Sequence, residues 1–183
     1  MPLGREDELL EIYLQPGEMF LARDPAIIRT LLGSCVGVSF WSARLGIGAL
    51  CHALLPRCPE GCTLDVKPEI GYRYVDFAIR DIARKFDRLG ARRPEVQVKL
   101  FGGADVLLGG SGQAVRATVG SLNCETALDV LRAEGFQIAA SSLRGTVGLK
   151  IHFNTGNGEI RLCRLNDHSG FAPPQAGTEG PIL

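Results

Sequence analysis

Apolar residues along most of the chain alternate with polar ones or form short runs bounded by glycine, proline or aspartate. This pattern is typical of β-strands, because successive strand side chains point to opposite faces of a sheet. The pattern predicts strands over residues 11–15, 19–23, 26–32, 36–41, 47–55, 96–101, 136–141, 147–153 and 159–165. The last two flank a Thr-Gly-Asn-Gly turn, and we expect them to form a hairpin.

Two segments have helical spacing instead. Residues 72–89 form the clearer predicted helix, and Gly90 ends it. Its apolar positions recur every three or four residues, at Val75, Ile79, Ile82, Ala83 and Phe86. A second helix is predicted over residues 125–134, with Asn123 as its N-cap and Gly135 after its end. Because strands dominate both ends and helices the middle, the fold class is α+β rather than a repeating β-α-β pattern.

Length and charge place the chain among ordinary globular domains. Its 183 residues fit one domain, which we expect over residues 1–171, followed by a disordered tail rich in proline and glycine over residues 172–183. Basic and acidic residues number 20 each, so the net charge is zero. That balance argues against a sequence-independent nucleic-acid binder and against a polybasic membrane contact.

The N-terminal residues are acidic where a secretory signal would be basic and then apolar. No apolar run approaches the ~20 residues that a membrane span needs. The sequence therefore predicts a cytoplasmic protein without membrane insertion. In that reducing compartment the six cysteines are expected to be mostly free thiols.

Cys35 and His52 are the first candidates for chemistry. Cys35 opens one predicted strand and His52 lies late in the next, so a hairpin would bring both to one end of a sheet. A cysteine thiolate is a nucleophile, and a histidine can serve it as general base. Gly33 and Ser34 leave the backbone before Cys35 uncrowded, which suits an oxyanion hole of main-chain N–H groups. Cysteine and histidine also occur as ordinary buried residues, and the spacing alone does not decide.

Other candidate sites are weaker. The hydroxyl group of Thr30 or of Ser34 could orient His52, although both residues also fit a strand and a turn. Cys58 and Cys62 could form half of a zinc site, but no second close pair of ligands follows. The glycine-rich stretches lack the spacing of nucleotide-binding loops. We therefore expect no cofactor and no metal.

Several motifs follow one another in a specific order. They are Thr30-Leu31-Leu32-Gly33-Ser34-Cys35-Val36, His52 with Leu54-Leu55-Pro56, Tyr74-Val75-Asp76, Lys99-Leu100-Phe101-Gly102-Gly103-Ala104, and Gly120 with Asn123. In this order they resemble the CheD family of chemoreceptor glutamine deamidases, from about residue 11 to 165. The resemblance implies a β-sandwich with helices packed on its outer faces.

The resemblance also implies the chemistry. Cys35 would be the nucleophile, His52 the general acid and base, and Thr30 the third catalytic residue; a gapless match would place Arg29 at the third position instead. The substrate would be the cytoplasmic helical bundle of a methyl-accepting chemoreceptor, and a CheC-type phosphatase would be a possible partner. Residues 142–150 depart from the family's glycine-rich turn, which affects partner contacts more than the chemistry.

Two alternatives remain open at this point. The fold could serve as a non-catalytic adaptor that binds a receptor or a CheC-type partner, although binding alone needs no thiol. The chain could also be a different cysteine hydrolase that acts on small amides. A deep, closed pocket would favour the small-amide enzyme, whereas a shallow groove would favour a protein substrate.

Overall fold

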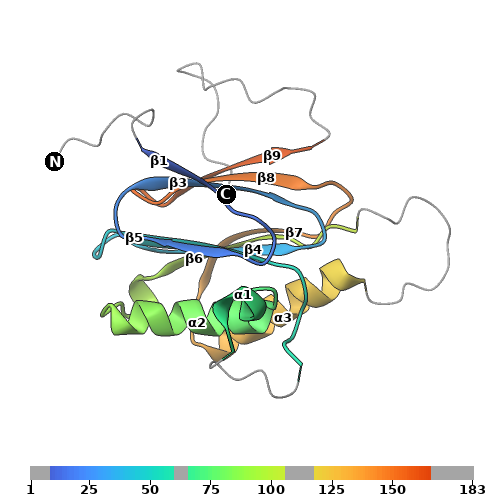
Figure 1. The fold of residues 1–183 in the computed structure, drawn as a ribbon, viewed down its shortest axis with the longest axis horizontal. Coiled ribbons are helices and arrows are strands. Elements are labelled where there is room, and N and C mark those ends of the chain that lie inside the picture. The colour runs from blue at the N-terminus through green and yellow to red at the C-terminus, as the bar shows by residue number, and fades with distance from the viewer. Residues whose placement is uncertain (1–8, 60–65, 106–117, 166–183) are drawn as a thin grey trace.

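Two β-sheets lie face to face in the computed structural model, which describes residues 9–59, 66–105 and 118–165 (Figure 1). The four-stranded sheet has the order β1 (Leu10–Tyr13), β3 (Ala26–Leu32), β8 (Leu149–Asn154) and β9 (Glu159–Arg164). The five-stranded sheet has the order β2 (Met19–Ala22), β5 (Ile47–Ala53), β4 (Val36–Ser42), β6 (Gln97–Gly102) and β7 (Ile138–Leu143). The pairs β1–β3 and β6–β7 are parallel and the other pairs are antiparallel.

The helices lie together on the outer face of the five-stranded sheet (Figure 1). They are α1 (Pro68–Gly71), α2 (Val75–Arg88) and α3 (Val119–Ala133), with a short 3-10 helix at Arg93–Glu95. Apolar side chains of α2 and α3 pack on this face, where Phe40 contacts Phe86 and Phe136 at ring distances of 5.9 and 5.3 Å. The α+β sandwich expected from the sequence is therefore confirmed, with the helices of the described residues on one outer face.

A second core fills the space between the sheets, where Leu50 and Phe101 from one sheet meet Ile28 and Phe153 from the other. The five-stranded sheet is thus covered on both faces. All seven residues of β5 are buried, which explains why this strand reads as an apolar run rather than an alternation. A polar side chain on such a strand needs a partner inside the protein.

The structure confirms most predicted elements and corrects others. The strands over residues 11–15 and 19–23 exist as β1 and β2, but they lie in different sheets and pair with β3 and β5. The hairpin of β8 and β9 is confirmed. Helix α1 was not expected from the pattern, and the tail over residues 172–183 lies outside the described residues.

The prediction that Asn123 caps the second helix is wrong. Helix α3 begins at Val119, and the side chain of Thr118 caps it by accepting a hydrogen bond from Ser121 N at 3.1 Å. Asn123 lies inside the helix and is fully buried. Its amide donates to backbone carbonyls outside the helix, which removes the penalty that asparagine otherwise carries at a helical position.

Candidate active site

The pairing of β4 with β5 sets the relative position of Cys35 and His52. Gly37 lies opposite His52 and Val36 lies opposite Ala53 in this antiparallel pair. Cys35 immediately precedes β4, so it lies at the same end of the sheet as His52. The hairpin that the sequence suggested is present, and it places both residues near the loop between β3 and β4.

Thr30 reaches His52 across the space between the two sheets. The Oγ1 atom of Thr30 lies 2.7 Å from His52 Nδ1 and 2.8 Å from the carbonyl oxygen of Leu14. A carbonyl oxygen can only accept, so the hydroxyl hydrogen of Thr30 goes to Leu14. Thr30 must then accept from His52 Nδ1–H. The neutral imidazole therefore carries its hydrogen on Nδ1 and its lone pair on Nε2.

His52 is held as a neutral base. Burial lowers its pKa from 6.5 to about 4, against smaller opposing effects of the nearby Leu14 backbone and the Glu18 charge. Its Nε2 atom is buried and has no hydrogen-bond partner among the described residues. Leaving a buried nitrogen unpaired is costly. Because Thr30 occupies Nδ1, Nε2 is the ring nitrogen that remains available for proton transfer.

Cys35 carries a half-buried free thiol. Burial raises the pKa of this thiol, and the backbone N–H of Cys35 itself opposes that rise. With the pKa of Cys35 raised and that of His52 lowered, Cys35 is a neutral thiol and His52 a neutral imidazole at rest. A neutral thiol can attack a carbonyl group only if a base takes its proton during the attack.

Three hydrogen bonds hold the turn that carries Cys35. The Gly33 carbonyl oxygen accepts from Ala104 N at 2.9 Å, and the Ser34 carbonyl oxygen accepts from Asn123 Nδ2 at 3.0 Å. The Cys35 carbonyl oxygen accepts from Gly103 N at 2.8 Å. In a planar trans peptide the N–H group points opposite to the carbonyl group. The N–H groups of Ser34 and Cys35 therefore point away from these donors, and no backbone carbonyl of the described residues accepts from either.

Two glycines at the end of β6 allow close contacts, one with this turn and one with α3. Gly102 has φ +100°, and a Cβ atom there would lie 2.2 Å from the carbonyl oxygen of Cys35. Gly103 has φ +68°, and a Cβ atom there would lie 2.1 Å from Cys124 Sγ. Positive φ and close approach both favour glycine. The sequence pattern could not identify the turn of Cys35 as the neighbour of this glycine pair.

The remaining candidates take other positions. Of the two hydroxyl candidates, Thr30 is the one bonded to His52. Arg29, the gapless match, forms an ion pair with Glu11 at 2.7 Å. Cys58 is disulfide-bonded, whereas Cys62 lies outside the described residues. Where the structure describes side chains, no three His, Cys, Asp or Glu residues are grouped to hold a metal ion.

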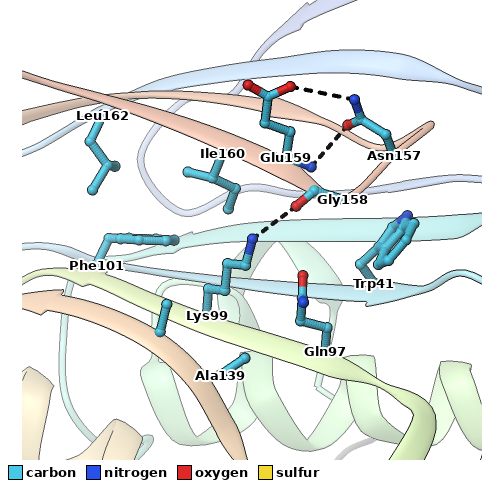
Figure 2. A pocket seen from close by; sticks show the side chains of 11 residues that line it. Trp41, Gln97, Lys99, Phe101, Ala139, Asn157, Gly158, Glu159, Ile160 and Leu162 are labelled. Atoms are coloured by element: carbon cyan, nitrogen blue, oxygen red, sulfur yellow. Dashed lines mark hydrogen bonds between the residues drawn. The ribbon is translucent and has the colours of Figure 1, made fainter. Parts of the chain in front are cut away.

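Two hollows in the described part of the chain are lined by residues other than Cys35 and His52. One, of about 250 Å³, lies between the sheets and is lined by Trp41, Lys99 and Phe101 among others (Figure 2). Lys99 spans it and donates to the carbonyl oxygen of Gly158 at 3.0 Å, which ties β6 to the β8–β9 hairpin (Figure 2). The other, of about 400 Å³, is lined by Pro16, Gly17, Glu18, Leu54, Glu69 and Arg73. Its lining residue Gly17 donates its N–H to the carbonyl oxygen of His52 at 2.7 Å.

The chain is similar to known proteins of one family. A family profile described as "CheD chemotactic sensory transduction" matches residues 59–164. A probable chemoreceptor glutamine deamidase CheD 2 from Geobacter sulfurreducens is 42% identical over 163 residues, covering 89% of this chain and 95% of that protein. A probable chemoreceptor glutamine deamidase CheD from Maridesulfovibrio salexigens is 37% identical, covering 92% of this chain and 99% of that protein. None of the helices in the described ranges is both long and apolar enough to cross a membrane.

Replacing Gly102 with alanine tests the contact between β6 and the Cys35 turn. Gly90→Ala is the control, because Gly90 also has a positive φ, +81°, but a Cβ atom there would meet nothing. Backbone strain alone should then lower its free energy of unfolding by about 1–2 kcal/mol. Gly102→Ala adds a clash with the Cys35 carbonyl oxygen and should cost about 1–3 kcal/mol more. Urea unfolding of both variants measures the difference. Equal losses would mean that β6 does not press on this turn.

The pH dependence of stability tests the buried neutral His52. Below its ordinary pKa of 6.5 the unfolded chain takes up a proton at His52, while the folded protein resists until about pH 4. The free energy of unfolding should therefore fall between these pH values, by about 2–3 kcal/mol from this residue. The variant His52→Asn keeps a donor for Thr30 and lacks this loss. Urea unfolding at several pH values in this range should show that the free energy of unfolding changes less steeply with pH in the variant than in the wild type. The same dependence on pH in both proteins would contradict the assignment.

Proposed function

The chain belongs to the CheD family, and we propose that it is a cysteine-dependent protein-glutamine deamidase that converts glutamine side chains of chemoreceptors to glutamate with release of ammonia. The observation that carries the proposal is the bond between Thr30 and His52. Because Thr30 gives its own hydrogen to Leu14, the lone pair of His52 lies on Nε2, on the side of the ring that Thr30 does not occupy. That is the tautomer that a general base requires.

The first half of the proposed reaction forms a thioester. His52 Nε2 takes the proton of Cys35 as Sγ attacks the carboxamide carbon of the glutamine side chain. The carbonyl oxygen becomes an oxyanion, which we assign to the N–H groups of the Gly33–Ser34–Cys35 turn. The imidazolium of His52 then protonates the nitrogen, the C–N bond breaks and ammonia leaves.

The second half consumes water. Neutral His52 takes a proton from a water molecule, whose oxygen attacks the thioester carbon. The C–S bond breaks, the proton returns to the sulfur of Cys35, and the side chain leaves as glutamate. Thr30 accepts from Nδ1–H throughout, so it keeps the ring oriented while the charge on the ring changes. The net reaction is carboxamide plus water to carboxylic acid plus ammonia, without a cofactor.

The lowered pKa of His52 fits this sequence of steps. A base with a pKa of about 4 deprotonates only a small fraction of the thiol when no substrate is bound. Once substrate binds, the developing oxyanion beside the ring favours the imidazolium, because an opposite charge nearby stabilises it. The proton transfer is thereby linked to the presence of a carboxamide.

The substrate and partner follow from the family. Relatives are named as chemoreceptor glutamine deamidases, so we propose a chemoreceptor cytoplasmic domain as the substrate and the cytoplasm as the place of reaction. New glutamates on the receptor would serve as methylation sites. A CheC-type phosphatase is proposed as a further partner from the family resemblance.

Mass spectrometry of a purified receptor cytoplasmic fragment tests the function. Incubation with the wild-type protein should raise the mass of a glutamine-containing peptide by about one unit, as the amide becomes an acid. Cys35→Ala should abolish this gain, and Thr30→Val should slow it by about 10²-fold, because His52 loses its orienting acceptor.

The matched control is Thr155→Val. Thr155 is also buried and also bonded to the main chain, accepting from Ala26 N at 2.9 Å, but it lies at the opposite end of β3 from Thr30. It should cost stability without slowing deamidation of the folded protein. No mass change with the wild-type protein, across receptors of the same cell, would favour the adaptor instead.

A further inference from the structure

Asn123 is a buried polar residue that the proposed reaction does not use. Its side chain is fully buried within α3, near the end of the sandwich that carries Cys35. Its Nδ2 atom donates two hydrogen bonds, to the carbonyl oxygen of Ser34 at 3.0 Å and to that of Leu54 at 2.9 Å. Both amide hydrogens are thus used on main-chain groups of other elements.

The orientation of this amide follows from its partners. Two carbonyl oxygens can only accept, so the nitrogen of Asn123 must face them and the oxygen must point away. The Oδ1 atom is buried without a hydrogen-bond partner among the residues described. An acceptor left unpaired in the interior is unfavourable, so the two donated bonds are what this residue contributes there.

The two acceptors belong to the segments that carry the reacting groups. Ser34 immediately precedes Cys35, and Leu54 is the second residue after His52. One side chain therefore ties the turn of the nucleophile to the end of the strand of the base. Gly103 N and Ala104 N hold the flanking carbonyl groups of the turn from the β6 side, and their hydrogen bonds go to this turn rather than to the strand of His52.

The bond to Ser34 also sets the direction of the Cys35 N–H group. The Ser34 carbonyl and the Cys35 N–H belong to the same planar peptide and point in opposite directions. If Asn123 holds the carbonyl, the N–H is fixed too. That N–H lowers the pKa of the Cys35 thiol, partly offsetting the effect of burial.

We propose that Asn123 is a positioning residue that fixes the peptide before Cys35 and the end of β5 relative to each other, so that the thiol, its backbone N–H and His52 stay aligned for attack. The proposal rests on the proposed function of Cys35 and His52. Asn123 contacts neither the thiol nor the imidazole directly; it acts through the main chain of Ser34 and Leu54.

Asn123→Leu tests the proposal, because leucine has a similar size and no donor. We expect kcat for deamidation of a receptor fragment to fall by about 10-fold or more, with KM changed by less than about 3-fold, since alignment acts on the reaction rather than on binding. We also expect alkylation of Cys35 by iodoacetamide, followed on its peptide by mass spectrometry, to show its midpoint at higher pH than in the wild type.

Val130→Ala is the matched control. Val130 is a buried apolar residue of the same helix that packs against the five-stranded sheet, so its truncation weakens the attachment of α3 and leaves both donated bonds in place. It should lower stability without moving the alkylation midpoint or kcat of the folded protein. All rates are measured at a temperature where circular dichroism shows each variant folded; if Asn123→Leu does not fold, Asn123→Ala replaces it.

The outcomes separate this proposal from the proposed function. If the wild type deamidates no receptor glutamine, the function fails, while the alkylation midpoint of Cys35 still tests Asn123. The positioning role is overturned if the wild type is active and the Asn123 variant keeps kcat within about 2-fold and the pH midpoint of Cys35 alkylation within error. A loss of stability alone, matched by Val130→Ala, would also overturn it.

Discussion

Burial of β5 on both faces is the constraint from which the site follows. A strand between two apolar layers leaves no water for a polar side chain, so His52 must find its partner inside the protein. Thr30 supplies that partner from the opposite sheet. Because its hydroxyl donates to Leu14, it must accept from His52 Nδ1–H, and this fixes the tautomer of the imidazole. The same burial that makes the fold stable thus determines which nitrogen of the imidazole is free.

The position of Cys35 depends on main-chain geometry rather than on side-chain packing. Planar peptides transmit direction, so donors on one side of the turn determine where the N–H groups on the other side point. Gly102 allows the end of β6 to come close enough for Gly103 N and Ala104 N to supply two of these donors, and α3 supplies the third through Asn123. The sandwich and its helical layer therefore meet at Cys35, the proposed nucleophile.

Sequence patterns predicted the elements that depend on local spacing, such as α2, β4, β5 and the β8–β9 hairpin. They failed where a residue's partner is distant. Asn123 fits the preference for a helix cap, yet its partners Ser34 and Leu54 are 89 and 69 residues away in the chain. The pairing of β1 with β3, rather than with β2, likewise depends on which sheet each strand joins, and periodicity carries no information about that.

Cys35 and His52 were candidates from their positions in two neighbouring predicted strands, and the family motifs then gave them roles; if they react as proposed, a buried, neutral site suits deamidation. A thiol with a raised pKa is mostly uncharged, and an uncharged thiol reacts slowly with oxidants and stray electrophiles. The proposed reaction needs charge separation only when a carboxamide occupies the site and its oxygen becomes an oxyanion. Low polarity around His52 then strengthens the attraction between imidazolium and oxyanion, because charges interact more strongly where water is excluded. Burial therefore disfavours a thiolate and an imidazolium at rest, and it strengthens the attraction between imidazolium and oxyanion during the attack. Reactivity is thereby linked to the presence of substrate.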